Sequence, residues 1–153
     1  MEKNNMIWGK YTWILFHTLA EKIKDEEFEN EKDNLISYIR RLCGVLPCSD
    51  CTMHATHMLN HYKYNHIKTK NDFKKFLFEF HNLVNNRKEY KNQDIKVLEQ
   101  YDKAILYRIL HVWNRTFIVS GMNSRLLTDS MHRNKVKKDF LNYMQSNLHK
   151  FNN

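Results

Sequence analysis

The sequence predicts an all-α protein, and three observations lead to that prediction. The chain has 153 residues but only three glycines and one proline, so few positions interrupt a helix. Its apolar residues recur mostly at intervals of three and four, the period of an amphipathic helix, while alternating runs typical of strands are few. A hydrophobic content of 42% is enough for the core of one ordinary domain. We therefore expect one helical domain without a hairpin.

The first half of the chain predicts three helices. The first is expected over residues 11–25, with Gly9 near its start and a broad apolar face. The second is expected over residues 32–46, because the apolar residues keep the helical period until Pro47 ends it. A third helix should begin at Cys48 and continue to about residue 62.

The second half predicts three more helices. Residues 63–70 are polar and are expected to form a loop, and a fourth helix should cover 72–88 with Asn71 as its N-cap. A fifth is expected over 95–119, residues 120–128 are expected to be a linker, and a last amphipathic helix over 135–148 should carry Lys137 on its surface. We thus expect a domain of residues 1–119 and a helical extension, 120–153, packed on the same domain.

The net charge of +8 suggests an anionic partner, which could be nucleic acid, an acidic protein or a phosphate-bearing cofactor. The lysines and arginines are scattered along the chain, which favours solvated helix faces over a dedicated nucleic-acid surface. The first residues contain charges and asparagines but no long apolar run, so we expect neither a secretory signal nor a membrane span.

The three cysteines are too few for a disulfide-stapled scaffold, yet two of them stand three residues apart, at Cys48 and Cys51. That spacing indicates redox chemistry, metal binding or coincidence. At the start of a helix, unpaired amide groups and the helix dipole favour a thiolate, and the two sulfurs are near enough to form a disulfide. Cys43 lies on an apolar helix face, where we expect a buried, inert thiol.

Zinc binding is the main alternative, because His54 and His57 follow the cysteine pair and the residue types suit zinc. Residues 48–57 on one helix span about 13 Å, so four such side chains cannot converge on one ion. A three-ligand site completed by a ligand from elsewhere stays open, and the alternative function is a zinc-binding helical protein with a structural or nucleic-acid-binding role.

Two groups of residues could build a slot for a flat ligand. Trp13 and His17 are four residues apart and share one helix face, and His81, Asn85 and Lys88 repeat on another. Aromatic rings beside a row of polar and basic side chains suit a flat aromatic molecule that carries phosphates. Such residues are by default ordinary core residues.

Three motifs resemble those of the Erv/ALR family of flavin-linked sulfhydryl oxidases. Residues 8–17, WGKYTWILFH, match its WGxxxWxxxH opening, residues 46–51, LPCSDC, resemble its redox motif, and residues 81–87, HNLVNNR, resemble its HNxVN flavin motif. The resemblance covers residues 7–101 and is greatest to the short oxidases of large cytoplasmic DNA viruses. It implies a four-helix bundle with an added helix, holding FAD at its mouth, within residues 1–119.

The resemblance also implies a role for each matching residue. Cys48 would exchange with the substrate, and Cys51 would lie against the isoalloxazine ring of FAD. Trp13 and His17 would pack on the adenine, while the remaining motif residues and neighbouring cations would contact the adenosine, the flavin and the pyrophosphate. The implied cofactor-binding set is Gly9, Trp13, His17, Cys51, His81, Val84, Asn85, Arg87, Lys88 and Lys91.

The implied activity is oxidation of thiols to disulfides, with oxygen reduced to hydrogen peroxide. No cysteine follows Cys51, so no internal relay is expected and a separate thiol protein, thioredoxin-like or a small CxxC protein, should react with Cys48 directly. The resemblance further implies a homodimer. A soluble protein is expected, in host cytoplasm or virion if viral and otherwise in an oxidising compartment such as the mitochondrial intermembrane space.

Overall fold

The computed structural model describes residues 2–118 and 124–153, and the side chains of residues 7–118 and 128–153. Within these ranges there is no strand and only one isolated antiparallel bridge, between Ile23 and Phe151. The predicted all-α class is therefore confirmed. The helices are α1 (Glu2–Lys22), α2 (Asp25–Cys43), α3 (Ser49–Asn60), α4 (Lys70–Arg87), α5 (Leu106–Thr116) and α6 (Ser124–Asn147), with short 3-10 helices η1 (Tyr64–His66), η2 (Ile95–Lys103) and η3 (Leu148–Lys150).

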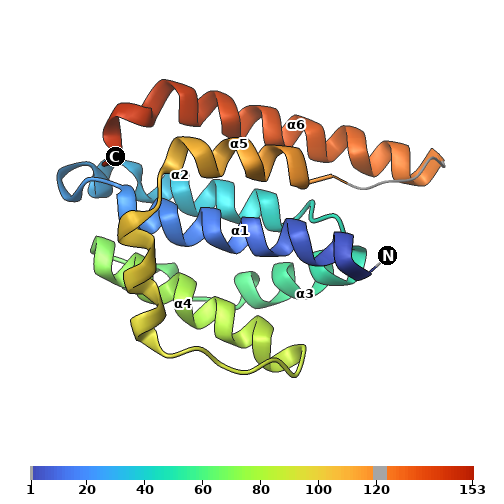
Figure 1. Ribbon diagram of the computed structural model, residues 1–153, viewed down its shortest axis with the longest axis horizontal. Coiled ribbons are helices and arrows are strands. Elements are labelled where there is room, and N and C mark those ends of the chain that lie inside the picture. The colour runs from blue at the N-terminus through green and yellow to red at the C-terminus, as the bar shows by residue number, and fades with distance from the viewer. Residues whose placement is uncertain (1, 119–123) are drawn as a thin grey trace.

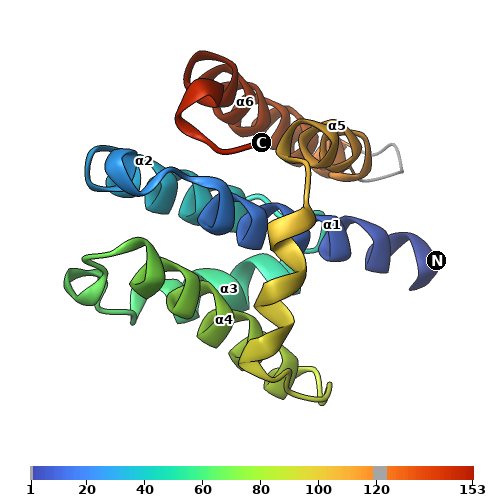
Figure 2. The same cartoon turned by 60° about the vertical axis from the view of Figure 1, so that its left-hand side comes forward.

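The α-helices lie in three layers (Figures 1 and 2). The middle layer is α1 and α2, with α3 and α4 on one side and α5 and α6 on the other. Helix α1 contacts α4, α5 and η2, and α2 contacts α3 and α6. In the described part of the chain, no helix combines the length and hydropathy needed to cross a bilayer.

One continuous apolar core joins all three layers. Leu15 of α1, Phe73 of α4 and Phe140 of α6 are fully buried members of the same cluster. Trp113 of α5 is also fully buried, and its indole Nε1 donates a hydrogen bond of 3.1 Å to Thr12 Oγ1 on α1. The C-terminal helices therefore share the core of the bundle.

The first helix extends further toward the N-terminus than predicted. The expected range 11–25 is wrong at both ends, since α1 is Glu2–Lys22. Gly9 consequently lies inside the helix, where an added Cβ would meet no atom within 4 Å beyond its chain neighbours and the helix's own backbone. Apolar periodicity begins late here because the first residues are polar, so the pattern misses the early turns.

The second helix is displaced toward the N-terminus relative to the predicted range 32–46. Its first turn carries Asp25, Glu26 and Glu27, and negative charges are favourable at a helix N-terminus. Its last residue is Cys43, and Gly44, not Pro47, provides the C-cap. By contrast, the third helix agrees with its prediction, because Cys48 is the N-cap of α3.

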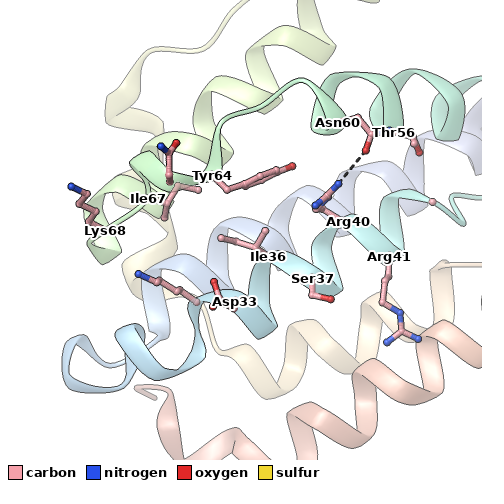
Figure 3. Close-up of a pocket in the computed structure, with 13 residues that line it drawn as sticks. Asp33, Ile36, Ser37, Arg40, Arg41, Thr56, Asn60, Tyr64, Ile67 and Lys68 are labelled. Carbon is pink, nitrogen blue, oxygen red and sulfur yellow. Dashed lines mark hydrogen bonds between the residues drawn. The ribbon is translucent and has the colours of Figure 1, made fainter.

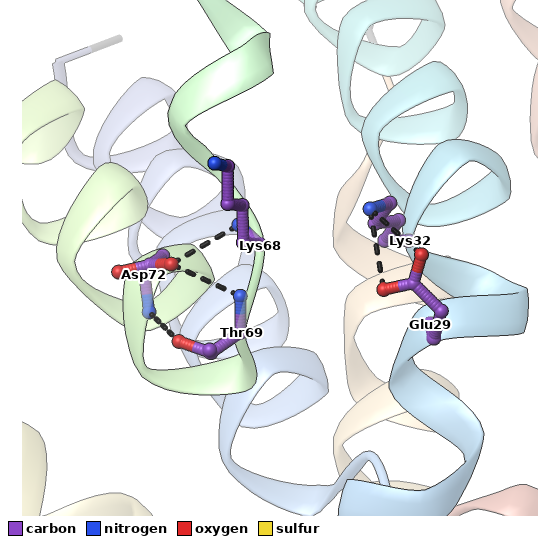
Figure 4. Close-up of polar contacts among 5 residues, drawn as sticks. All are labelled: Glu29, Lys32, Lys68, Thr69 and Asp72. Atoms are coloured by element: carbon purple, nitrogen blue, oxygen red, sulfur yellow. Dashed lines mark hydrogen bonds and ion pairs between the residues drawn. The ribbon is translucent and has the colours of Figure 1, made fainter.

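A capping box opens α4, and its N-cap is Thr69 instead of the predicted Asn71 (Figure 4). The Thr69 hydroxyl accepts a hydrogen bond of 3.1 Å from the Asp72 amide, and the Asp72 carboxylate accepts from the amides of Lys68 and Thr69, each at 3.0 Å. These backbone hydrogen bonds lower the pKa of Asp72. Figure 4 also shows the ion pair of Lys32 with Glu29, one turn apart on α2.

The helix predicted over 95–119 is wrong, because the chain there forms two elements. The backbone is extended at Ala104 and Ile105, and this break separates η2 from α5. Both η2 and α5 pack against α1, and each has its own helix-axis direction there. Apolar spacing continues across the break and therefore cannot show it. Val119, the predicted end, lies outside the described residues.

The last helix is much longer than the predicted range 135–148. Residues 120–123 of the expected linker lie outside the described residues, and its second half, from Ser124, already belongs to α6. Lys137 is not a surface residue as predicted, because only 7% of it is exposed. Its Nζ donates hydrogen bonds to the carbonyl oxygens of Asn114 and Phe117, at 2.9 and 3.2 Å, where α5 ends.

Candidate functional site

The redox pair lies at the N-terminus of α3. Cys48 and Cys51 form a disulfide, with their Cα atoms 5.2 Å apart. Cys48 is the N-cap, and its Sγ accepts a hydrogen bond of 3.2 Å from the amide of Cys51. Unpaired amides and the helix dipole at this end stabilise a thiolate whenever the disulfide opens. The geometry therefore suits thiol–disulfide exchange.

A cleft of about 560 Å³ opens beside the disulfide, a size typical of sites for organic ligands. It forms where the beginning of α1, the beginning of α3 and the end of α4 meet. The wall contains two lysines and no carboxylate, so it is electropositive and suits an anionic ligand. The lining residues are Trp8, Gly9, Lys10, Trp13, Cys48, Cys51, His81, Val84, Asn85, Lys88 and Tyr90.

An aromatic stack forms one side of the cleft. The rings of Trp13 and His81 are parallel within 7°, with centroids 4.0 Å apart. Behind them, Nε2 of His17 and Nδ1 of His81 share a hydrogen bond of 2.9 Å, and His17 also stacks on Tyr101. The predicted slot between Trp13, His17 and His81 is therefore wrong, since these rings already contact each other. A flat ligand must lie on the outer face of the stack.

Both histidines of the stack are neutral at ordinary pH. Burial, and secondarily the neighbouring His81, lowers the pKa of His17 to about 3. Burial alone lowers the pKa of His81 to about 4. A neutral stack can hold an aromatic ring without a competing charge, and the cationic contribution to the cleft comes from lysines.

A narrow apolar cavity of about 70 Å³ lies next to the cleft. Cys51 lines both spaces, while Cys48 lines only the cleft. Trp8 also lines both, and its buried indole N–H has no hydrogen-bond partner among the described residues. Cys51 is thus the inner sulfur of the pair, and Trp8 offers an unused donor near it.

The structure brings most of the predicted site residues together. Arg87 lines the apolar cavity instead of the cleft, His17 is buried behind His81, and Lys91 is exposed on the loop after α4 and lines neither space. The predicted residues that line the cleft are Gly9, Trp13, Cys48, Cys51, His81, Val84, Asn85 and Lys88.

Sequence reasoning missed three residues of the cleft, Trp8, Lys10 and Tyr90. The first two lie inside the WGKYTW segment, so that motif could have indicated them. Tyr90 had no such signal. It follows Glu89, whose φ of 60° turns the chain, and the Tyr90 amide donates a hydrogen bond of 2.8 Å to the carbonyl of Asn85.

A larger cavity, of about 820 Å³, lies on another part of the surface, between α2 and the α3–η1 segment (Figure 3). It contains no cysteine, and three of its four cations have side-chain partners. Arg40 donates to Asn60, Arg41 to Asp139, and Lys32 pairs with Glu29. This cavity therefore does not include the redox pair.

The geometry does not support the zinc alternative. Cys48 and Cys51 are joined to each other, so neither is a free thiolate ligand. Over the residues that the structure describes, no three or more His, Cys, Asp or Glu side chains gather as a metal site. His57 instead packs its ring against that of His61, with centroids 4.4 Å apart.

Comparison with known proteins agrees with the site. The family model described as Erv1 / Alr family matches residues 10–103, more than half of the chain. The chain belongs to the Erv1 / Alr family. The match includes the redox pair, the HNLVNNR segment and η2, and it ends before α5 and α6.

Curated relatives named as FAD-linked sulfhydryl oxidases are identical to this chain at about one aligned residue in three. The "FAD-linked sulfhydryl oxidase" of African swine fever virus (isolate Warthog/Namibia/Wart80/1980) is 33% identical over 63% of this chain and 90% of its own. The "Putative FAD-linked sulfhydryl oxidase 347L" of Invertebrate iridescent virus 6 is 32% identical over 53% and 78%.

A cellular relative is longer. "FAD-linked sulfhydryl oxidase ERV2" of Saccharomyces cerevisiae is 29% identical over 61% of this chain, and the matched part spans about half of the yeast protein, 48%. No solved structure gives a significant match to the chain.

Proposed function

We propose that this protein is an FAD-dependent sulfhydryl oxidase that forms disulfides in partner proteins. One observation carries the proposal: the Cys48–Cys51 disulfide lies in the wall of an electropositive, aromatic-lined cleft at a helix N-terminus. A redox disulfide beside a site for a flat anionic cofactor is the arrangement that electron transfer from thiols requires. Family membership and the names of the relatives support the same conclusion.

The residues of the cleft fit FAD. A flat ring system can lie on the outer face of the Trp13–His81 stack. Lys10 and Lys88 supply positive charge for a pyrophosphate, and the unpartnered Trp8 indole N–H can donate to a polar cofactor atom. We propose that these residues, with Gly9, Val84, Asn85 and Arg87, hold the cofactor, while His17 supports the stack and Lys91 acts only at longer range.

The two cysteines have different roles in the proposed reaction. A substrate thiolate attacks Cys48 Sγ, the disulfide breaks, and Cys51 is released as a thiolate stabilised by the helix N-terminus. A second substrate thiol then displaces Cys48, so the substrate disulfide forms and the pair is left reduced by two electrons. FAD, when bound, would supply the acceptor for those two electrons, and oxygen would take them up with two protons to give hydrogen peroxide.

We propose that the substrate is a separate thiol-bearing protein. Cys43 is the only other cysteine in the sequence and it is buried, so no internal thiol can carry electrons to Cys48. A thioredoxin-like or small CxxC protein would present its two thiols to Cys48 one after the other. We also propose a homodimer, and a 120–153 extension that packs on the same domain as residues 1–119.

Two measurements on the purified protein test the function. A flavoprotein should be yellow, with absorption at about 450 nm. Thiol-dependent oxygen consumption should be present in the wild type and absent in Cys48→Ser, which cannot form the initial mixed disulfide. A colourless protein, or equal oxygen consumption by Cys48→Ser, would exclude the proposal.

A further inference from the structure

A buried arginine of α6 contacts the loop that leads into the redox motif. Arg133 is 5% exposed, and its Nε donates a hydrogen bond of 2.7 Å to the carbonyl of Val45. One of its terminal nitrogens donates to the carbonyl of Leu46, at 3.2 Å. The guanidinium therefore holds two consecutive carbonyls, and Cys48 follows only two residues after the second.

These two carbonyls need partners from outside the loop. The amides of Gly44 and Val45 donate hydrogen bonds to carbonyls in the last turn of α2, and Pro47 has no amide hydrogen to donate. Leu46 also accepts a weaker hydrogen bond, of 3.4 Å, from the hydroxyl of Thr52 on α3. Buried carbonyls without partners are costly, and a charged donor is a strong one, so Arg133 has a large effect on this loop.

Arg133 lies outside residues 10–103, the part matched by the family model. We propose that Arg133 is a positioning residue for the redox pair, holding residues 45–46 so that Cys48 stays at the N-cap of α3 within bonding distance of Cys51. Its effect on catalysis rests on the proposed oxidase function. The proposed effect of Arg133 on the disulfide equilibrium is independent of the oxidase function, because the two sulfurs meet in the folded chain whatever the electron acceptor is.

The same helix provides a matched control. Lys137, one turn further along α6, is equally buried and also donates to two backbone carbonyls. Those carbonyls belong to Asn114 and Phe117, at the end of α5, and not to the redox loop. Removing Lys137 therefore disturbs the packing of α6 without releasing the chain before Cys48.

The experiment measures the equilibrium of the Cys48–Cys51 disulfide in glutathione redox buffers, by trapping free thiols and counting them by mass. Arg133→Met should shift the pair toward the dithiol by about tenfold, equivalent to about 30 mV for a two-electron couple, because the two sulfurs are held together less well. Arg133→Lys, which keeps the charge but loses the fork, should shift it less. Lys137→Met should stay within about twofold of the wild type.

Each outcome decides the proposal. A folded Arg133→Met protein with the wild-type equilibrium would overturn it, and so would an equal shift in Lys137→Met. If Arg133→Met does not fold, Arg133→Lys decides in the same way, with no shift counting against the proposal. The assay needs neither flavin nor oxygen, so a wild type that equilibrates normally but consumes no oxygen would refute the oxidase function and leave the result on Arg133 standing.

Discussion

The three cysteines differ in reactivity because of where the fold places them. Cys48 and Cys51 meet at a helix N-terminus beside a cleft, whereas Cys43 is fully enclosed at the end of α2. Burial raises the pKa of the Cys43 thiol to about 12, so almost none of it is thiolate at neutral pH. This burial agrees with the prediction that Cys43 is a buried, inert thiol.

We predict that Cys43→Ser retains thiol-dependent oxygen consumption within about twofold of the wild type, because its sulfur takes no part in exchange. The buried hydroxyl should instead lower the free energy of unfolding by about 1–2 kcal/mol. Oxygen uptake and urea unfolding on the same preparation measure both effects. Cys51→Ser is the control that should lose activity, and an equally inactive Cys43→Ser would show that this thiol participates.

The histidine stack should make stability depend on pH. The pKa values of His17 and His81 lie at about 3 and about 4 in the folded protein, below the ordinary 6.5. Below pH 6.5 the unfolded chain therefore binds protons that the folded chain does not, and stability falls as the pH falls. We predict a loss of roughly 1 kcal/mol per pH unit for each histidine between pH 6 and pH 4.

Urea unfolding at pH 6 and pH 4 measures this loss. A His81→Gln variant should lose about half of the difference between the two pH values, because one of the two depressed groups is gone. Imidazole resonances of both histidines titrating at the ordinary value in the folded protein would contradict the prediction.

At the scale of the element, the start of α4 shows how side chains determine a helix boundary. Thr69 and Asp72 satisfy each other's backbone amides, and Asn71 has no role in this box. We predict that Thr69→Ala lowers the free energy of unfolding by about 1 kcal/mol. The cap lies at the opposite end of α4 from His81, so the flavin spectrum should not change.

Asn71→Ala is the matched control, and it should cost clearly less than Thr69→Ala. Chemical denaturation of the two variants and the wild type distinguishes them. A larger loss from Asn71→Ala would favour the N-cap predicted from the sequence over the one seen in the structure.

At the scale of the whole molecule, polar contacts as well as apolar packing attach α6 to the bundle. Tyr143 donates a hydrogen bond of 3.1 Å to the buried carboxylate of Glu31 on α2, and Lys150 pairs with the same carboxylate at 3.4 Å. Phe140 lies fully buried in the shared core. The proposed 120–153 extension is thus coupled to α2 and to the apolar core that α2 shares with the helices lining the cleft.

FAD should stabilise the whole fold, because its proposed site is a cleft formed by three helices that exists only in the native state. A ligand at a hundredfold excess over Kd adds about 2.7 kcal/mol. We predict that FAD raises the Tm of the stripped protein by several degrees, measured by scanning calorimetry.

His81→Ala should lose most of the FAD-dependent increase in Tm, because it removes the ring that stacks on Trp13. Lys138→Ala, an exposed change on α6, should keep it. If FAD leaves the Tm of the wild-type apoprotein unchanged, the cleft is not its site.

The sequence by itself determined the helical class, the redox pair and most of the predicted residues that line the cleft. These features depend on short-range properties: apolar period, the CxxC spacing, and motif residues one or two turns apart. Cys48 as the N-cap of α3 is the clearest case, since the cap, the pairing and the chemistry all follow from neighbouring residues.

Only the tertiary structure decided where helices break and which polar residues are buried. The extended residues between η2 and α5, the closed Trp13–His81 stack and the burial of Lys137 each depend on segments far apart in the chain. Arg133 shows the physical reason. Its partners, the carbonyls of residues 45 and 46, lie 88 and 87 positions away, and no local pattern records which backbone groups a distant charged side chain will satisfy.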